Sequence, residues 1–278
     1  VLDEGSVIGD GILPGVASPV ALLGVAEKGF VTVELSVSGT GGHSSLPPPR
    51  SAIGILAAAV DRLEHEQLPA RLPAGSPTRA LFETLGPHFP IGQRIAFANL
   101  WLTRPLVLNT LEKGAATNAM IRTTTAVTIF EAGTKENVLP SVARAVVNFR
   151  ILQGDSSASV IEHVRATVDD PRVSVRRAGA FVAEPSRVSR TASEGFRRLA
   201  RSIRAVFPGT LVAPYLVVVV TDSRHFADLT DDTFRFLPLT LSVPDLARMH
   251  GTDERISVAG YDQAIRFYRE LIRASAAR

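Results

Sequence analysis

The clearest pattern along the chain is a strand, a turn and a helix between residues 29 and 66. Apolar and polar residues alternate from Val31 to Ser38, which is the period of a strand with one buried face. After three prolines, apolar residues recur at helical spacing and predict an amphipathic helix, at Ile53, Leu56, Val60 and Leu63. The turn between them, GTGGHSSLPPP, carries His43 between a glycine pair and a stiff proline run.

Two interpretations of His43 follow from its position. The rigid flanks predict a turn that presents the imidazole at a fixed place, as a functional histidine requires. The alternative is an ordinary exposed loop histidine, which is the commoner situation for a histidine in a polar turn.

The pattern continues with three further strands and a second helix. Strands are predicted at residues 123–130, 142–151 and 173–177, and a helix capped by Asp155 lies between the last two. Residues 67–123 show short helical patterns broken by Pro and Gly, which we interpret as a helical insertion. The order strand, helix, strand, strand, helix, strand is that of a ferredoxin-like α+β domain.

The two ends of the chain predict a different kind of domain. PYLVVVV is a continuous apolar run, which is typical of a strand buried on both faces of a parallel sheet, and TDSRHF follows it directly. An amphipathic helix over 257–274 closes the chain. We therefore expect one α/β domain made of residues 1–28 and 182–278, interrupted by a domain over 29–181 that contains the 67–123 insertion.

Composition narrows the class of protein. A chain of 278 residues with 45% hydrophobic residues can bury a sizeable core, and its longest apolar run is too short to span a bilayer, so we expect no membrane segment. The net charge is only +3 and basic residues are scattered without interleaved aromatic residues, which argues against nucleic-acid binding. The lack of cysteine excludes disulfides and thiolate metal ligands.

The first residues also carry an expectation. A chain that opens VLDEG, without methionine, is expected to have been cut from something longer. Any signal peptide or anchor would then lie outside it, so the sequence does not indicate a localisation, and cytoplasmic and secreted proteins both remain open.

Five motifs appear in one order: LDEG, EKGF followed by GGHSSLPPP, NVLP with its Asn137 thirteen residues before the Arg150 of NFR, TDSRHF, and MHGTDERI. In this order they resemble the dinuclear-zinc aminoacylase and carboxypeptidase family, in the branch of carboxypeptidase S and the N-fatty-acyl-amino-acid hydrolases. The resemblance implies a zinc-exopeptidase α/β catalytic domain, present here in part, with an inserted ferredoxin-like lid or dimerisation domain. It also implies two zinc ions per full-length subunit and homodimers formed through the lid.

The resemblance assigns roles to six residues. Asp3 and His250 match one ligand of each zinc ion, and His43 matches the lid histidine that polarises the scissile carbonyl, which in dimeric relatives comes from the partner subunit. Asn137 and Arg150 match the pair that holds the substrate near its carboxylate, and Arg224 lies close to the site in this branch. Carboxylate and imidazole are ligands that zinc takes. Four of these residues also have a structural explanation: Asp3 as a strand end, His250 as a loop histidine bonded to Asp253, Asn137 as a turn former and Arg150 as part of a solvated strand face.

The sequence departs from that family in one large respect. The family's H-x-D ligand motif, bridging Asp and Glu-Glu pair precede LDEG, and none of them occurs here; none of the six histidines stands in an H-x-D pattern. We therefore expect this chain by itself to bind zinc poorly, to expose apolar surface and not to hydrolyse amides. The run Asp222, His225, Asp228 has the composition of a metal site, but its members are expected to scatter around a turn.

Three functions are compatible with these observations. The first is hydrolysis of amide bonds in small peptides or N-acyl amino acids by a zinc enzyme of which this chain is a part. The second is a non-catalytic module for dimerisation or for binding acyl-amino acids, and the third is nucleic-acid binding. The aromatic residues of the insertion, Phe82, Phe89, Phe97 and Trp101, either line an apolar acyl pocket or pack the core of the insertion itself.

Overall fold

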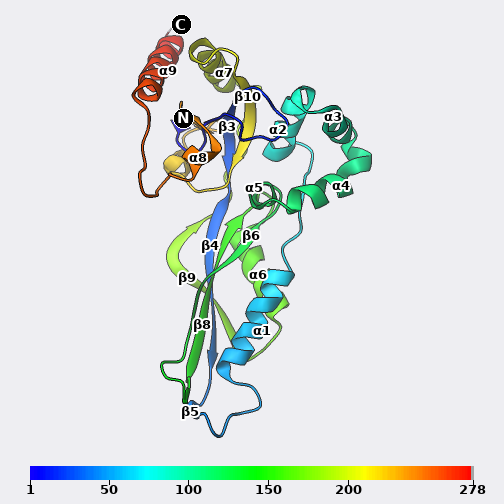
Figure 1. Cartoon of the computed structure of the whole chain (residues 1–278), viewed down its shortest axis with the longest axis vertical. Helices are drawn as coiled ribbons and strands as arrows, with labels where there is room; N and C mark the ends of the chain where they lie inside the picture. The colour runs from blue at the N-terminus through cyan, green and yellow to red at the C-terminus, as the bar shows by residue number, and fades with distance from the viewer. Residues whose placement is uncertain (277–278) are drawn as a thin grey trace. The chain divides into compact units, whose positions relative to one another are not determined.

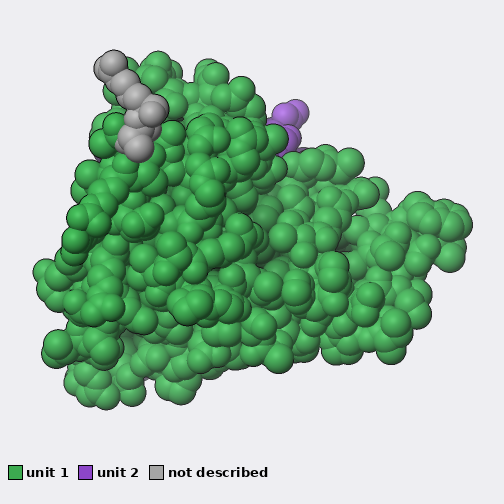
Figure 2. All heavy atoms as spheres, turned by 90° about the horizontal axis from the view of Figure 1, so that it is seen from above, with its two compact units in different colours: residues 1–27, 72–114, 186–278 green, residues 28–71, 115–185 purple. Residues whose placement is uncertain are grey.

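The computed structural model describes residues 1–276, which form two compact units (Figures 1 and 2). Unit 1, green in Figure 2, contains Val1–Glu27, Leu72–Gly114 and Ser186–Arg278; unit 2, purple, contains Lys28–Arg71 and Ala115–Pro185. We had placed residues 67–123 in the inserted domain, whereas residues 72–114 of the structure group with unit 1. The physical reason is that α2 (Pro77–Leu85) buries Leu81, Phe82 and Leu85 and packs against β10 (Leu211–Val217).

Unit 2 has the ferredoxin-like topology that the sequence predicts. Its sheet has the order β6-β8-β4-β9, and every neighbouring pair is antiparallel. The strands are β4 (Gly29–Ser38), β6 (Thr124–Ala132), β8 (Val142–Ile151) and β9 (Val173–Ala183). A separate ribbon is made of β5 (Gly42–His43) and β7 (Val138–Leu139), and the helices are α1 (Ala52–His65), α5 (Ala115–Ala119) and α6 (Ser157–Val168).

The core of unit 2 lies between one face of this sheet and the helices α1 and α6. The alternation in β4 is confirmed, because its apolar side chains are fully buried there, at Val31, Val33, Leu35 and Val37. They meet the apolar stripe of α1, including Leu56 and Leu63, and the α6 residues Val160 and Val164. The expected cap of α6 was wrong by one residue. Ser156 caps the helix and forms a capping box with Ser159, and Asp155 instead pairs with Arg71 at 2.6 Å.

Unit 1 contains a six-stranded sheet centred on β3 (Val20–Glu27), all of whose residues are buried. Strand β10 pairs with β3 in parallel, as the apolar run predicts, although the strand ends at Val217 and not at Val220. The remaining strands are β1 (Leu2–Asp3), β2 (Ile8–Gly9), β11 (Phe234–Arg235) and β12 (Thr240–Leu241). Both parallel and antiparallel pairs occur, so the sheet is mixed.

Helices cover unit 1 and supply the segments that follow its strands. They are α2, η1 (Gly86–His88), α3 (Ile91–Ala98), α4 (Leu100–Glu112), α7 (Glu194–Val206), η2 (Asp222–Phe226), α8 (Val243–Leu246) and α9 (Val258–Ala276). The closing helix α9 packs against α7 and buries Phe267 in the same core as Ile203 and Leu23. None of the helices in the described part of the chain combines the length and the apolar character that a membrane crossing needs.

Candidate active-site elements

The ribbon formed by β5 and β7, called here the tip ribbon, carries His43. Gly41 and Gly42 before it have positive φ angles of 66° and 127°, which glycine adopts readily and which turn the chain sharply out of β4. His43 then pairs with Val138 in the antiparallel ribbon, and its side chain is exposed. The glycine pair thus brings the imidazole out of the sheet, and its exposure is compatible with both interpretations of His43.

The proton on the His43 ring is located by its hydrogen bonds. Nδ1 accepts from the backbone N–H of Ser45 at 3.2 Å and lies 2.8 Å from the Ser45 hydroxyl. Because a backbone N–H only donates, Nδ1 is an acceptor and the neutral ring carries its proton on Nε2. Nε2–H is therefore a fixed hydrogen-bond donor that faces solvent.

Asn137 lies beside His43 on the same ribbon. Its backbone carbonyl accepts a hydrogen bond of 3.1 Å from the N–H of Ser44, and the residue is exposed. The structure therefore brings together these two of the expected site residues, His43 in β5 and Asn137 in the turn directly before β7.

Within one chain, Arg150 lies far from His43 and Asn137. It stands opposite Phe30 in the β4–β8 pairing, whereas the other end of β8, at Val142, adjoins the tip ribbon. Eight residues of strand separate Val142 from Arg150, or roughly 26 Å at about 3.3 Å per residue. The Arg150 guanidinium lies 4.8 Å from the centre of the Phe30 ring, and partial burial lowers its pKa. Asn137 and Arg150 of one chain thus cannot hold the same small carboxylate.

Lys28, near the Arg150 end of unit 2, was missed by the sequence analysis. Its side chain is fully buried, and Nζ donates to the carbonyls of Ala119 at 3.0 Å and Arg122 at 2.8 Å. Burial, with a smaller effect from the nearby Arg150 charge, lowers its pKa to about 7, while Asp155 acts in the opposite direction. The available signal was a charged residue in the otherwise apolar stretch VALLGVAEKG.

In unit 1, Asp3 ends strand β1 and has one carboxylate oxygen without a protein partner. Oδ1 accepts from the N–H of Glu4 at 2.9 Å, but Oδ2 is buried and forms no hydrogen bond. A buried carboxylate oxygen without a hydrogen bond favours a nearby cation, and the Arg235 charge supplies part of that interaction. This observation fits the expected role of Asp3 as a zinc ligand.

Glu27 at the end of β3 organises the segment that contains Arg224. Its carboxylate accepts hydrogen bonds from the N–H of Thr221 at 2.9 Å and from the Thr221 hydroxyl at 2.8 Å, and Arg235 donates to it at 3.3 Å. Burial lowers the pKa of Arg235, and the Glu27 charge opposes that shift. The Arg224 guanidinium folds back to donate to the Thr221 carbonyl at 3.1 Å. Glu27 therefore holds the start of η2, which sequence reasoning did not foresee.

His250 occupies a polar loop before α9. Its φ angle of 57° is in the left-handed region, and its side chain is 93% exposed. The backbone N–H of His250 donates to Glu254 at 3.1 Å, so the loop contact is with Glu254 and not with Asp253. The ring is accessible to a ligand.

The donor types of Asp3 and His250 suit zinc, but the described residues do not complete a metal site. Within residues 1–276, no three His, Cys, Asp or Glu side chains gather closely enough to hold an ion, and this includes the run Asp222, His225, Asp228. A catalytic zinc site has three protein ligands and an open position. Asp3 and His250 would supply only one ligand to each zinc ion, which is fewer than the three that such a site has.

Comparison with known proteins identifies the family of the chain. The family model of the peptidase dimerisation domain of M20 peptidases matches residues 25–175. The chain is 45% identical to N-fatty-acyl-amino acid synthase/hydrolase PM20D1 of Xenopus tropicalis over 99% of its own length and 53% of that protein. It is 41% identical to probable carboxypeptidase S-like 2 of Dictyostelium discoideum over 98% of its length and 52% of that protein.

A solved structure shows the same fold. The M20 family metallo-carboxypeptidase Sso-CP2 of Sulfolobus solfataricus superposes with a TM-score of 0.64 at 17% identity, covering 97% of this chain and 62% of that one. The chain thus spans about half the length of the curated relatives it matches. It belongs to the M20 metallopeptidase family, whose peptidase dimerisation domain lies within its residues 25–175.

Proposed function

We propose that this chain is part of a zinc-dependent hydrolase that cleaves the amide bond of N-acyl amino acids or small peptides. The observation that carries the proposal is the 45% identity to an N-fatty-acyl-amino acid synthase/hydrolase along practically the whole chain. Because about half of that relative has no counterpart here, we further propose that the complete site requires residues that this chain does not supply.

His43 is the residue of this chain that we assign to the chemical step. The Ser45 contact to Nδ1 leaves Nε2–H as the donor of an exposed side chain. Amide hydrolysis places negative charge on the former carbonyl oxygen, and a prepositioned donor at that oxygen stabilises the transition state by about 2.7–4 kcal/mol. A neutral Nε2–H tautomer is the form that donates without first needing protonation.

Arg150 and the tip ribbon act on one substrate only if two chains contribute. They lie at opposite ends of the unit 2 sheet, yet the resemblance assigns both to the substrate. A homodimer formed through the dimerisation domain resolves this, because one subunit then supplies Arg150 and its partner supplies His43 and Asn137. The arginine fork suits a carboxylate at the end of the substrate.

We assign Asp3 and His250 as one ligand each of two zinc ions. The unpartnered Oδ2 of Asp3 and the exposed ring of His250 support this assignment. Zinc supplies a polarised carbonyl and an activated water when it is bound. Since the described residues provide too few ligands, we expect the isolated chain to bind zinc poorly and to lack amidase activity.

Metal analysis of two purified proteins tests the proposal: this chain, and the longer polypeptide that continues it upstream in the same gene. The longer form is expected to bind about two zinc ions per subunit and to release amino acids from N-acyl amino acids, whereas the short form does neither. If the longer form binds no zinc and hydrolyses neither substrate class, the chain is a non-catalytic module for dimerisation or acyl-amino-acid binding. Stoichiometric zinc in the short form would instead refute the ligand assignment.

A further inference from the structure

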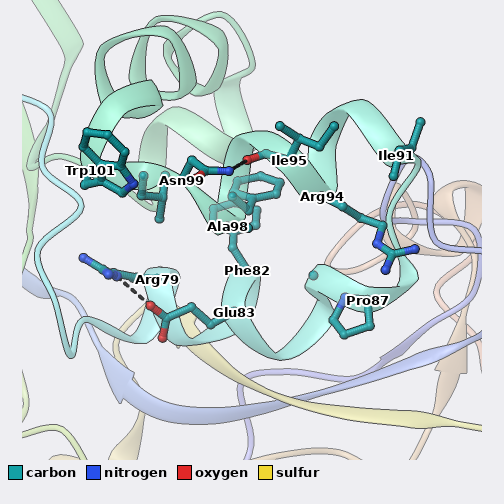
Figure 3. Close-up of a pocket in the computed structure, with 13 residues that line it drawn as sticks. Arg79, Phe82, Glu83, Pro87, Ile91, Arg94, Ile95, Ala98, Asn99 and Trp101 are labelled. Atoms are coloured by element: carbon teal, nitrogen blue, oxygen red, sulfur yellow. Dashed lines mark hydrogen bonds and ion pairs between the residues drawn. The ribbon is translucent and has the colours of Figure 1, made fainter.

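Helices α2, α3 and α4 of unit 1 surround an open cavity of about 590 Å³ (Figure 3). Its volume lies within the roughly 300–1,000 Å³ typical of small-molecule sites. Phe82 and Phe97 both line it and stack on each other with ring centres 4.5 Å apart. The aromatic residues of the insertion thus pack a small core and form a wall of the cavity at the same time.

The rim of this cavity exposes large apolar side chains. Trp101 is 83% exposed, Ile91 69% and Ile95 57%, and all three line the cavity. Figure 3 shows Trp101 on one side and Ile91 on the other, with Phe82 and Ala98 between them. Apolar groups gathered around a concavity mark a binding surface, because their exposure to water is unfavourable.

The charge of the cavity is positive. Arg94 lines the side opposite Trp101 (Figure 3), and it takes part in no ion pair with a carboxylate among residues 1–276. Arg79 also lines the cavity but is neutralised by Glu83 at 2.7 Å. The sequence has no acidic residue between Glu83 and Glu112. A long apolar wall with one available guanidinium fits a ligand with an alkyl chain and an anionic head.

We propose that this cavity binds a long-chain acyl carboxylate, either a fatty-acid anion or an N-acyl amino acid, with the alkyl chain along Phe82 and Phe97 and the carboxylate at Arg94. Only the choice of N-acyl amino acids as ligands rests on the proposed function. Binding itself requires neither zinc nor catalysis. Failure of one proposal therefore leaves the other open to its own test.

The sequence provides a direct reporter for this binding, because Trp101 is the only tryptophan of the chain. The chain is titrated with decanoate, dodecanoate, N-dodecanoyl-glycine and the uncharged dodecanol, each below its critical micelle concentration. We expect a saturable blue shift of tryptophan emission, an affinity that rises about fourfold for each buried methylene, and weaker binding of the alcohol. Equal affinities of dodecanoate and N-dodecanoyl-glycine identify a general acyl-anion site, whereas preference for the latter identifies an acyl-amino-acid site.

Two matched pairs of variants locate the site. Ile95→Ser and Arg94→Gln alter the cavity lining, whereas Leu106→Ser and Arg104→Gln alter exposed residues of α4 that do not line it. The cavity variants are expected to weaken dodecanoate binding by about tenfold, and the α4 variants to leave it unchanged. Circular dichroism checks that all four variants fold.

Three outcomes would overturn the proposal. The first is no saturable change of Trp101 emission with any acyl anion. The second is an equal loss of affinity in the cavity and control variants, which would place the ligand elsewhere. The third is a spectral shift with phosphatidylcholine vesicles but not with monomeric dodecanoate, which would identify a lipid surface and not an acyl anion as the occupant.

Discussion

Glu27 Oε2 and Arg235 Nε lie 3.3 Å apart in an ion pair whose two side chains are 3% and 2% exposed. The same carboxylate holds the backbone and hydroxyl of Thr221. A single buried anion at the end of β3 therefore connects β11 and the start of η2 within unit 1.

Glu27→Leu is expected to lower the free energy of unfolding by about 3 kcal/mol, because it removes the ion-pair partner of the buried Arg235 guanidinium and leaves Asp3 as its remaining counter-charge. Combining it with Arg235→Leu should recover part of that loss, since the unpaired charge is then gone. Urea denaturation followed by circular dichroism measures both effects. As a control, the exposed pair Glu194 and Arg201 should change stability by no more than about 1 kcal/mol when Glu194 is replaced by Gln.

The lowered pKa of buried Lys28 should make the free energy of unfolding depend on pH. Its pKa is about 7 in the folded chain and 10.5 in the unfolded one, so between these values the unfolded chain binds the extra proton. Stability from this group is therefore fully present above pH 10.5 and is lost as pH falls toward 7. Relative to Lys28→Met, the free energy of unfolding of the wild-type chain should rise by up to about 1.4 kcal/mol per pH unit between pH 7 and 10.

Urea denaturation at pH 6, 7, 8 and 9 measures that difference, because other titrating groups cancel between wild type and variant. Lys135→Met alters an exposed lysine of the same unit and is the control for the loss of a lysine as such. A flat difference for Lys28→Met would contradict the lowered pKa.

The His43 ring should carry its proton on Nε2 in solution. Long-range ¹H–¹⁵N correlation spectra at pH 8.5 distinguish the two neutral tautomers by the ¹⁵N shifts of the ring. The Nε2–H form should persist in Ser45→Ala, because the backbone N–H of residue 45 remains the donor to Nδ1. Ser45→Pro removes that donor and should yield a mixture of tautomers; a pure Nδ1–H form in the wild type would rule out the proposed donor role.

Arg150 and His43 should complement each other between subunits. In the upstream-extended protein, His43→Ala and Arg150→Ala are each expected to lower kcat/KM on an N-acyl amino acid by about 10²-fold or more. Mixed and reassociated, the two variants form heterodimers in which one of the two sites contains both residues, so activity should rise above that of either parent. Native mass spectrometry verifies that heterodimers have formed. If activity still does not rise, the two residues either act within one chain or do not act on the same substrate.

Local patterns predicted most of unit 2 because its elements bury one face each. The alternation in Val31 to Val37 and the stripe of Leu56 and Leu63 have the periods of the elements they form. The cap of α6 was placed one residue early because Asp and Ser are both good caps. The Asp155 carboxylate instead binds Arg71 and the Thr123 hydroxyl, and both contacts join distant parts of the sequence.

The buried charges and the grouping of the insertion were not predictable in this way. Glu27 and Lys28 are adjacent and both buried, yet their partners lie about 90 residues or more away along the sequence, at Thr221 and Ala119. The periodic pattern of apolar and polar residues cannot predict contacts between residues so far apart in the sequence. Likewise, α2 was assigned by its position in the sequence, whereas its buried face meets β10, a strand that begins only at Leu211.

The pairing of β3 with β10 also governs how unit 1 must form. Val20 lies opposite Leu211, so β3 can pair with the nearby β2 early, but its pairing with β10 can form only after residues up to Leu211 have been synthesised. All of β4, β6, β8 and β9 emerge in that interval, and their antiparallel pairs join nearer neighbours in the sequence. Because closing long loops slows folding, unit 2 should become protected from hydrogen exchange before unit 1 during refolding.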